Sequence, residues 1–191
     1  MKRTTFLRLA LAAGSLALAP LALQARRAAK ARINKGLRVP SGQDRFGHPL
    51  TLFEGDTFYC KVSGKDTEGD VYVFESTRLK KGGPPLHYHF AQDEYWYVLE
   101  GEFLFKVGEE LFTAKAGDSL FGPRMVPHAF AKTNEGPARL LMFFQPAGLM
   151  EEHFKAVSDG VTANFSEAER NAFREKHGFK VVGPALTYLK Q

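Results

Sequence analysis

The sequence of 191 residues predicts an all-β fold: a small antiparallel jelly-roll barrel followed by a short C-terminal helical segment. Short strand-like runs follow one another from about residue 41, and clusters of Gly, Pro, Asn and Asp separate them, which is typical of an antiparallel barrel. The chain also contains 17 Phe residues, most of them between Phe46 and Phe144. Phenylalanine favours strands and buries a large apolar area, so this enrichment predicts an aromatic barrel interior.

The predicted strands are short, and turn residues bound each of them. Gly55-Asp56 and Gly117-Asp118 are two of these breaks. We expect strands at 50–54, 57–63, 70–79, 86–90, 94–100, 102–107, 110–113, 118–121, 127–132 and 138–145.

Helical spacing of apolar residues begins only after Pro146. Met150, Phe154 and Val157 fall on one side of a helix predicted over residues 150–157.

A second helix is predicted to begin at Ser166. Ser166 and Glu169 have the spacing of a capping box, in which the two side chains satisfy backbone N–H groups at the helix start. We expect this helix to run to about His177 and to end at Gly178, because glycine readily takes the left-handed conformation that closes a helix.

The single cysteine and three of the six histidines receive structural interpretations. Cys60 lies in a strand-like run and has no second cysteine to pair with, so we expect a buried, inert thiol and no internal disulfide. His153 and His177 lie on or at the ends of predicted helices, and His48 lies beside a proline in an apparent loop. We interpret these three as surface or capping histidines.

The chain divides into four segments by composition and pattern. We assign residues 1–25 to a signal peptide, 26–40 to a basic flexible linker, 41–147 to the barrel, and 148–191 to a C-terminal helical segment and tail.

The first 25 residues have the layout of a secretory signal peptide. A positively charged start with Arg3 and Arg8 precedes an uncharged Ala/Leu run over 9–23, and Ala25 is a suitable cleavage position. This run is shorter than the roughly 20 apolar residues that a membrane-spanning helix needs. The start also resembles a twin-arginine export signal, but Thr4 replaces the second arginine, so we favour the general secretory route. The expected location is therefore secreted or periplasmic.

The formal net charge of +5 is concentrated at the N-terminus. Nine Lys and Arg residues lie in 2–38, which leaves 17 basic against all 21 acidic residues, a net charge of −4, in the rest of the chain. The expected folded domain is thus mildly acidic and has no basic stripe with interleaved aromatic residues, which argues against nucleic acid as a partner. We expect a small-molecule substrate and no stable membrane insertion after processing.

His87, His89, Glu94 and His128 form the ligand set of a metal site. Three imidazoles and one carboxylate suit a divalent transition metal. Alternate side chains of a strand share a face, so His87 and His89 point the same way. His128 comes from a distant segment, and a barrel brings such segments to one cavity.

The spacing of these residues resembles the two motifs of the cupin superfamily. The first motif, H-x-H-x4-E-x6-G, matches at His87, His89, Glu94 and Gly101. The second, G-x5-P-x4-H, matches at Gly117, Pro123 and His128.

Over about residues 46–189 the chain is similar to bacterial single-domain cupins described as quercetin dioxygenase-like. This resemblance implies a jelly-roll barrel, one metal ion and dioxygenase activity, and it makes a homodimer the expected assembly. It also implies that Glu94 binds the metal and accepts the hydroxyl proton of the substrate, which would make this residue catalytic.

Met125 departs from the family pattern, because it occupies a position that is usually glycine. Since Met takes positive φ less readily than glycine, we expect the local turn to differ.

The cavity wall follows from strand alternation. If Glu94 faces inward, Trp96 and Val98 do too, and Phe130 accompanies His128. Met125 lies close enough to the last ligand to contribute to the wall. Phe103, Phe105, Met142 and Phe144 are further candidates, and Lys132 and Arg124 are interpreted as surface charges. A cavity with aromatic walls suits a flat or apolar substrate.

Three functions are compatible with such a site. The first is a dioxygenase that acts on a small aromatic or enolisable substrate. The second is a metal-dependent isomerase or lyase for a small oxygenated acid or sugar, and the third is a non-catalytic small-ligand-binding protein. The pattern leaves the metal open among Fe, Mn, Ni, Cu and Zn.

Overall fold

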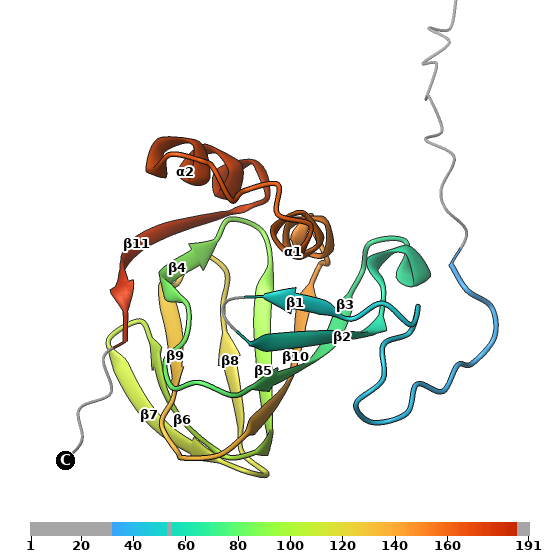
Figure 1. The fold of residues 1–191 in the computed structure, drawn as a ribbon, viewed down its shortest axis with the longest axis horizontal. Coiled ribbons are helices and arrows are strands. Elements are labelled where there is room, and N and C mark those ends of the chain that lie inside the picture. The colour runs from blue at the N-terminus through green and yellow to red at the C-terminus, as the bar shows by residue number, and fades with distance from the viewer. Residues whose placement is uncertain (1–31, 53–54, 187–191) are drawn as a thin grey trace, which may run out of the picture.

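The computed structural model describes residues 32–52 and 55–186. The predicted signal peptide (1–25) and the first part of the predicted linker (26–31) lie outside the described residues. Two antiparallel β-sheets form a jelly-roll barrel around an aromatic core, and Figure 1 shows both helices at one end of this barrel.

The larger sheet has six strands. Its order is β1 (Leu50–Leu52), β2 (Asp56–Val62), β3 (Tyr72–Arg78), β10 (Ala138–Gln145), β5 (Asp93–Glu100) and β8 (Ser119–Gly122).

The smaller sheet has five strands. Its order is β11 (Phe179–Ala185), β4 (Pro85–His89), β9 (His128–Lys132), β6 (Glu102–Val107) and β7 (Glu110–Lys115).

All the strands expected from the sequence are present, and their bounds agree to within about two residues. Strand β11 was not among them, because the prediction placed 148–191 in a helical segment and tail. This strand pairs antiparallel with β4, and Phe179 lies opposite His89 while Val181 lies opposite His87. The C-terminal segment therefore completes the sheet that carries three of the predicted metal ligands, His87, His89 and His128.

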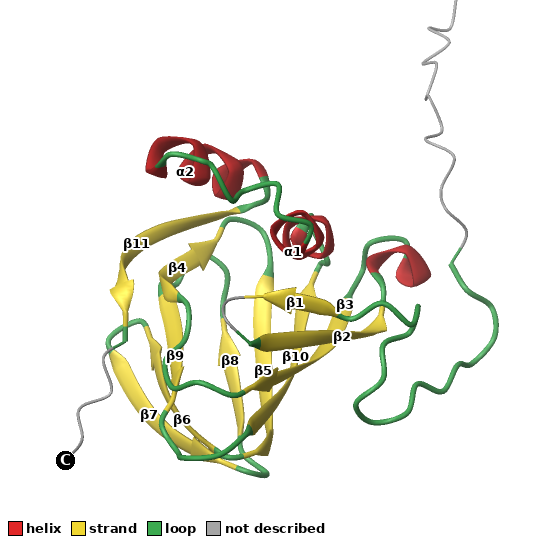
Figure 2. Cartoon of the chain, in the orientation of Figure 1, coloured by secondary structure: helices red, strands yellow, loops and turns green. Residues whose placement is uncertain are grey.

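Both predicted helices are confirmed, as α1 (Met150–Ser158) and α2 (Glu167–Lys176) (Figure 2). Ser166 is the N-cap of α2, and both hydrogen bonds of its capping box with Glu169 are present. The chain leaves this helix through Gly178, whose φ is 96°. A short 3-10 helix, η1 (Gly64–Thr67), was not predicted.

The burial of β5 follows the predicted alternation. Glu94, Trp96 and Val98 are buried, whereas Tyr97 is exposed. Phe103, Phe105, Met142 and Phe144 are also buried in the core.

Cys60 is buried in the core, as predicted. Burial raises the pKa of its thiol to about 12. A thiol with this pKa stays protonated near neutral pH, so it is a poor nucleophile.

The described part of the predicted linker, residues 32–40, is mostly exposed. Its first residues nevertheless contact η1 and the turn after it. The Arg32 guanidinium pairs with Asp70, and the backbone N–H of Ile33 donates to the carbonyl oxygen of Asp66 at 3.0 Å. Among the described residues, the helices are too short or too polar to cross a membrane.

Candidate metal centre

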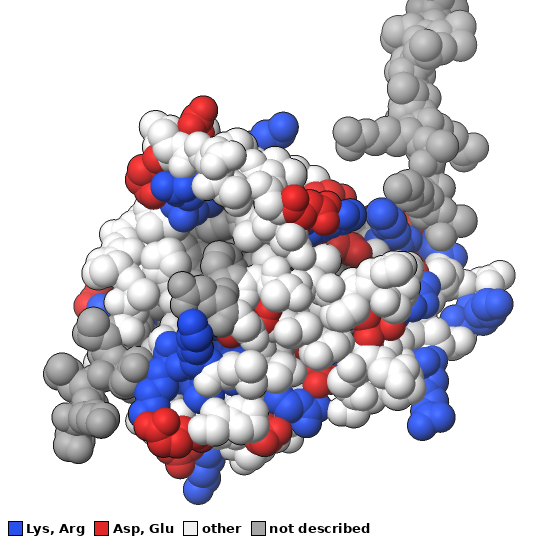
Figure 3. All heavy atoms as spheres, viewed as in Figure 1, with Lys and Arg blue, Asp and Glu red and all other residues white. Residues whose placement is uncertain are grey.

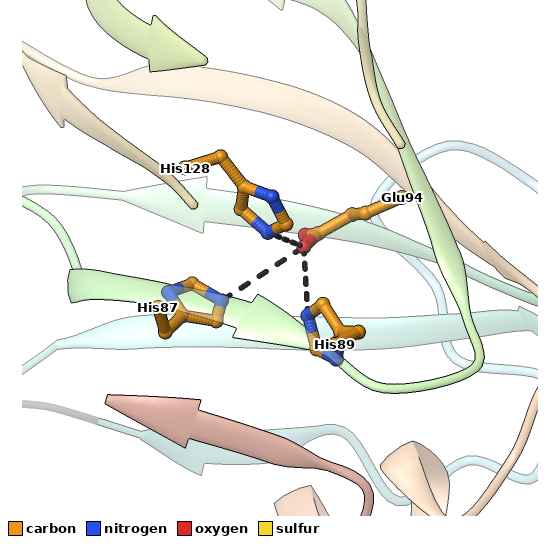
Figure 4. A group of neighbouring side chains, drawn as sticks. All are labelled: His87, His89, Glu94 and His128. Carbon is orange, nitrogen blue, oxygen red and sulfur yellow. Dashed lines mark hydrogen bonds and ion pairs between the residues drawn. The ribbon is translucent and has the colours of Figure 1, made fainter. Parts of the chain in front are cut away.

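His87, His89, Glu94 and His128 converge inside the barrel from three strands (Figure 4). His87 and His89 are two residues apart on β4, so their side chains leave the strand on the same face. Glu94 comes from β5, and His128 begins β9 directly opposite His87. One potential ligand atom from each of the four lies within 4.8 Å of all the others.

The Glu94 carboxylate is the centre of this group. Its Oε2 lies 3.1 Å from His128 Nε2, 3.2 Å from His89 Nε2 and 4.0 Å from His87 Nε2. All four side chains are buried, and His87 keeps the largest exposed fraction, at 9%. Bulk water is therefore largely excluded from these atoms.

Backbone carbonyls determine which nitrogen carries the proton in two of the rings. His87 Nδ1 lies 2.8 Å from the carbonyl oxygen of Pro85, and His128 Nδ1 lies 3.0 Å from that of Val126. A carbonyl oxygen can only accept, so both Nδ1 atoms must be donors. In the neutral ring the lone pair is then on Nε2, the atom that faces Glu94. Hydrogen bonds of this kind orient metal-binding histidines in proteins.

The charge state of the site favours a cation between these atoms. Burial, with smaller contributions from His128 and His89, lowers the pKa of His87 to about 3, so this ring is neutral near pH 7. Burial raises the pKa of Glu94, but hydrogen bonding and charge from His128 and His89 outweigh it and hold the pKa below its ordinary value. The lone pair of the neutral His87 ring therefore points toward an ionised carboxylate. Three imidazole nitrogens and one carboxylate oxygen in this arrangement fit a divalent transition metal.

Aromatic rings enclose the four residues and hold the histidines in place. The Trp96 ring lies 5.2 Å from the His128 ring, and Phe144 lies 5.0 Å from His89. Phe179 of β11 contacts both His87 and His89, at 5.6 and 5.5 Å. The C-terminal strand thus supports the site as well as the sheet.

Gly122 permits the close packing beside His128. A Cβ atom at this position would lie 2.6 Å from the Trp96 ring and 3.1 Å from His128 Nδ1. No larger residue fits here unless one of these rings moves.

A cavity of about 420 Å³ adjoins the metal centre. His87 and Glu94 form part of its wall, so the centre can be reached from it. Its apolar lining comes from both sheets and from α1, and consists of Phe58, Phe130, Met142, Phe144, Met150, Phe154, Phe179 and Val181. The charged lining residues, apart from Glu94, are Asp56, Arg78, Lys80, Lys81 and Arg174.

The residues predicted for the cavity wall occupy different places. Phe130 lies on the wall. Trp96 and Val98 are buried in the core, where Trp96 packs on His128, and neither is among the described lining residues.

Met125 is 57% exposed and is likewise not among the described lining residues. It adopts a φ of 64°, the left-handed conformation that glycine takes more readily, and its backbone N–H donates to the carbonyl oxygen of His89 at 2.8 Å. The chain therefore accepts the unfavourable conformation and keeps this turn close to β4.

The interpretation of His153 as a surface or capping residue is wrong. Only 5% of His153 is exposed, it lies on the cavity wall, and its ring lies 4.9 Å from Phe179. Its Nδ1 is buried and has no hydrogen-bond partner among the described residues. Burial lowers the pKa of His153 to about 3, so the ring is neutral. The sequence did contain a signal for this burial, because His153 lies on the same apolar helix face as Met150, Phe154 and Val157.

His177 and His48 agree better with their interpretation as surface or capping residues. His177 is the C-cap of α2, and its Nδ1 donates to the carbonyl oxygen of Phe173 at 2.7 Å, although the side chain is buried. His48 is exposed.

The two cations interpreted as surface charges, Arg124 and Lys132, differ in their exposure. Arg124 is exposed and pairs with Asp93 at 2.7 Å. Lys132 is 1% exposed, and its Nζ donates to the carbonyl oxygen of Asn134 at 2.7 Å, so its prediction as a surface charge is wrong. The alternation of β9 could not show this, because both faces of that strand are buried.

An unpredicted buried ion pair completes the cavity wall. Arg78 Nη1 lies 2.6 Å from Asp56 Oδ2, and both residues are buried. The Arg78 guanidinium lies 4.5 Å from the centre of the Phe130 ring. The two residues come from neighbouring strands of the larger sheet, so the sequence alone offers no sign that they meet.

Comparison with known proteins extends these observations. Residues 76–144 match the family described as Cupin domain. The uncharacterized protein MJ1618 of Methanocaldococcus jannaschii is 33% identical over 61 residues, which are 32% of this chain. The matched part spans 49% of the length of that relative.

Two solved structures illustrate the range of similar proteins. An RmlC-like cupin from Shewanella frigidimarina is 21% identical, with a TM-score of 0.47 over 61% of this chain and 96% of that one. The polyketide cyclase RemF from Streptomyces resistomycificus is 20% identical, with a TM-score of 0.47 over 58% of this chain and 80% of that one.

The metal centre described above contains the residues at which the two cupin motifs were recognised. His87, His89, Glu94 and His128 all lie within the residues that match the family. The part of the jelly-roll barrel over residues 76–144 is therefore similar to the family described as Cupin domain.

Proposed function

We propose that this protein is a metal-dependent oxygenase, similar to quercetin dioxygenases, that acts on a small aromatic or enolisable substrate. One observation carries the proposal. His87 and Glu94 belong both to the candidate metal centre and to the wall of an aromatic cavity of about 420 Å³. A small molecule in this cavity would therefore meet the metal-binding residues directly, which distinguishes a reactive site from a closed structural one.

A redox-active ion held by these four residues would supply the electron-transfer chemistry that an oxygenase needs. The chain itself supplies orientation and proton transfer. The phenylalanine wall holds a flat molecule against the centre and excludes water. Glu94 is buried beside the cavity, and once its carboxylate dissociates from the ion it can accept the proton of an enol or phenol hydroxyl.

Metal analysis and oxygen uptake on the same sample of the full chain test this proposal. We expect a divalent transition metal in the purified protein, and oxygen consumption with a flavonol, a catechol or a β-diketone. Glu94→Gln should abolish the uptake, whereas His48→Ala, which changes an exposed histidine, should leave it intact.

Two results would contradict the proposed activity. Absence of bound metal, together with no affinity for any of the five candidate ions on reconstitution, would remove the metal centre. Turnover at the same rate without oxygen would assign isomerase or lyase chemistry instead.

We also propose that the protein is exported, on the basis of the signal-peptide layout of residues 1–25. N-terminal sequencing of the protein from the periplasmic or secreted fraction should give a chain that starts shortly after Ala25. Recovery of the uncleaved chain from the cytoplasm alone would contradict export.

A further inference from the structure

Positive charge is concentrated around the cavity. Among the described residues, four cations and two carboxylates line it, namely Arg78, Lys80, Lys81, Arg174, Asp56 and Glu94. Two of the cations have partners outside this lining, because Lys81 pairs with Glu135 and Arg174 with Glu167. The chain beyond residue 38 has the opposite balance, with 17 basic and 21 acidic residues. In Figure 3, Lys and Arg atoms lie above and below the recess beneath α2. The described lining thus has more cationic than anionic side chains, unlike the chain beyond residue 38, and this composition suits an anionic ligand.

Both carboxylates of the described lining, Asp56 and Glu94, already have partners. Glu94 lies among the three histidines of the metal centre, and Asp56 is already paired with Arg78. A bound metal would add further positive charge beside His87. An anion in the cavity would meet the Arg78 guanidinium among apolar walls, where a low dielectric weakens screening.

Arg78 is the cation most deeply placed in this wall. Only 5% of the residue is exposed, and its guanidinium lies against the Phe130 ring at 4.5 Å. A guanidinium has five N–H donors. Among the described residues, Asp56 accepts from Nη1, while the buried Nε has no partner. A buried cation with this many donors and one monodentate carboxylate is incompletely satisfied, and a ligand carboxylate would complete it.

Arg78 lines the same cavity as the candidate metal centre, since His87 and Glu94 are also among its lining residues. A ligand in this cavity can therefore contact Arg78 and face His87 and Glu94.

We propose that the cavity binds a small organic carboxylate, with its carboxylate beside Arg78 and its apolar or aromatic body against the phenylalanine wall. The inference rests on the proposed function, since it names the substrate class of that site. Arginine suits this role because its planar donors match the two oxygens of a carboxylate. The apolar wall favours a carboxylate that carries an aromatic or unsaturated body.

Binding of matched charged and neutral probes to the metal-free full chain tests the proposal. The probes are benzoate and benzamide, and salicylate and salicylamide, measured by calorimetry and by ligand-detected NMR. We expect each carboxylate to bind about tenfold more tightly than its amide. Inorganic phosphate should not displace benzoate at equal concentration.

The variants assign this preference to Arg78. Because Arg78→Met alone leaves Asp56 buried without a partner, the test uses the double variant Asp56→Asn/Arg78→Met with Asp56→Asn as its reference. Asp56→Asn should keep the preference for carboxylates, and the double variant should lose it while retaining its thermal unfolding transition. Lys155→Gln, which removes an exposed charge outside the described cavity lining, should bind both probes as the unmodified chain does.

Equal binding of acid and amide, no binding of either carboxylate, or a preference that survives in the double variant would each overturn the proposal. Displacement of benzoate by phosphate would do so too, and would assign a phosphate site. These results do not depend on turnover. An active oxygenase without carboxylate preference would refute this inference alone, whereas carboxylate binding without oxygen uptake would refute the proposed oxygenase alone.

Discussion

The His128 ring and the Glu94 carboxylate face one another inside the barrel. His128 Nε2 lies 3.1 Å from Glu94 Oε2, and its other nitrogen, Nδ1, must donate to the carbonyl oxygen of Val126. In the neutral ring, two lone pairs then meet in a buried site, an arrangement that a bound cation stabilises. This relationship is the physical basis for the first prediction.

His128→Ala should lower metal affinity by about 100-fold or more, since even the loss of an outer-shell partner often costs 10–100-fold. Calorimetry and elemental analysis measure this effect. Metal added at about 100 times its Kd should raise the free energy of unfolding of the unmodified chain by about 2.7 kcal/mol, and a chelator should reverse the gain. In His128→Ala, we expect neither the stabilisation by added metal nor its reversal by a chelator. His48→Ala should respond to metal and chelator as the unmodified chain does.

Gly122→Ala should disturb the metal centre through sterics alone. The added Cβ would approach the Trp96 ring to 2.6 Å and His128 Nδ1 to 3.1 Å. We expect destabilisation of about 1–3 kcal/mol in chemical denaturation, and weaker metal binding. Gly36→Ala is the matched control, because a Cβ there meets nothing within 4 Å. Unchanged stability and metal affinity in Gly122→Ala would show that the rings adapt freely.

His153→Phe should leave the free energy of unfolding unchanged or raise it by up to about 1 kcal/mol. The substitution removes a buried Nδ1 that has no partner among the described residues, and it keeps the aromatic packing. His153→Ala should instead cost about 2–4 kcal/mol, since it leaves a void. His177→Phe is the matched comparison. It should lose about 1 kcal/mol, because the Nδ1 of that ring donates to Phe173. A loss in His153→Phe as large as that in His153→Ala would contradict the absence of a partner.

The Asp56 and Arg78 side chains should be strongly coupled in a double-mutant cycle. Arg78→Met should destabilise the fold by about 3–5 kcal/mol, because it leaves a buried carboxylate without its partner. Asp56→Asn/Arg78→Met should recover much of this loss, since neither remaining group is charged. Urea unfolding of the four chains gives the coupling energy, and additive effects would show that the pair is not electrostatically linked.

Cys60 should make the fold less stable at high pH. The folded-state pKa of about 12 lies above the ordinary value of 9.0, so between these pH values the unfolded chain releases the thiol proton and the folded chain keeps it. The free energy of unfolding should therefore fall as pH rises from about 9 to about 12. Cys60→Ala should lose this part of the pH dependence, whatever its stability at pH 7. Equal slopes for the two chains would contradict the prediction.

The sequence by itself was enough to predict strands β1 to β10, both helices and the group of four candidate metal ligands. These features depend on short-range properties. Turn residues mark the ends of strands, a capping box marks the start of α2, and the alternation of a strand places His87 and His89 on one face.

Only the tertiary structure decided the rest, because it depends on which remote segments pack together. Residues 179–185 become a strand only beside β4, where Phe179 also covers His87 and His89. His153 is buried only because α1 packs against the barrel, and Arg78 meets Asp56 only through the pairing of neighbouring strands. Local pattern thus identified the candidate metal ligands, whereas long-range packing built the cavity beside them and placed Arg78 in its wall.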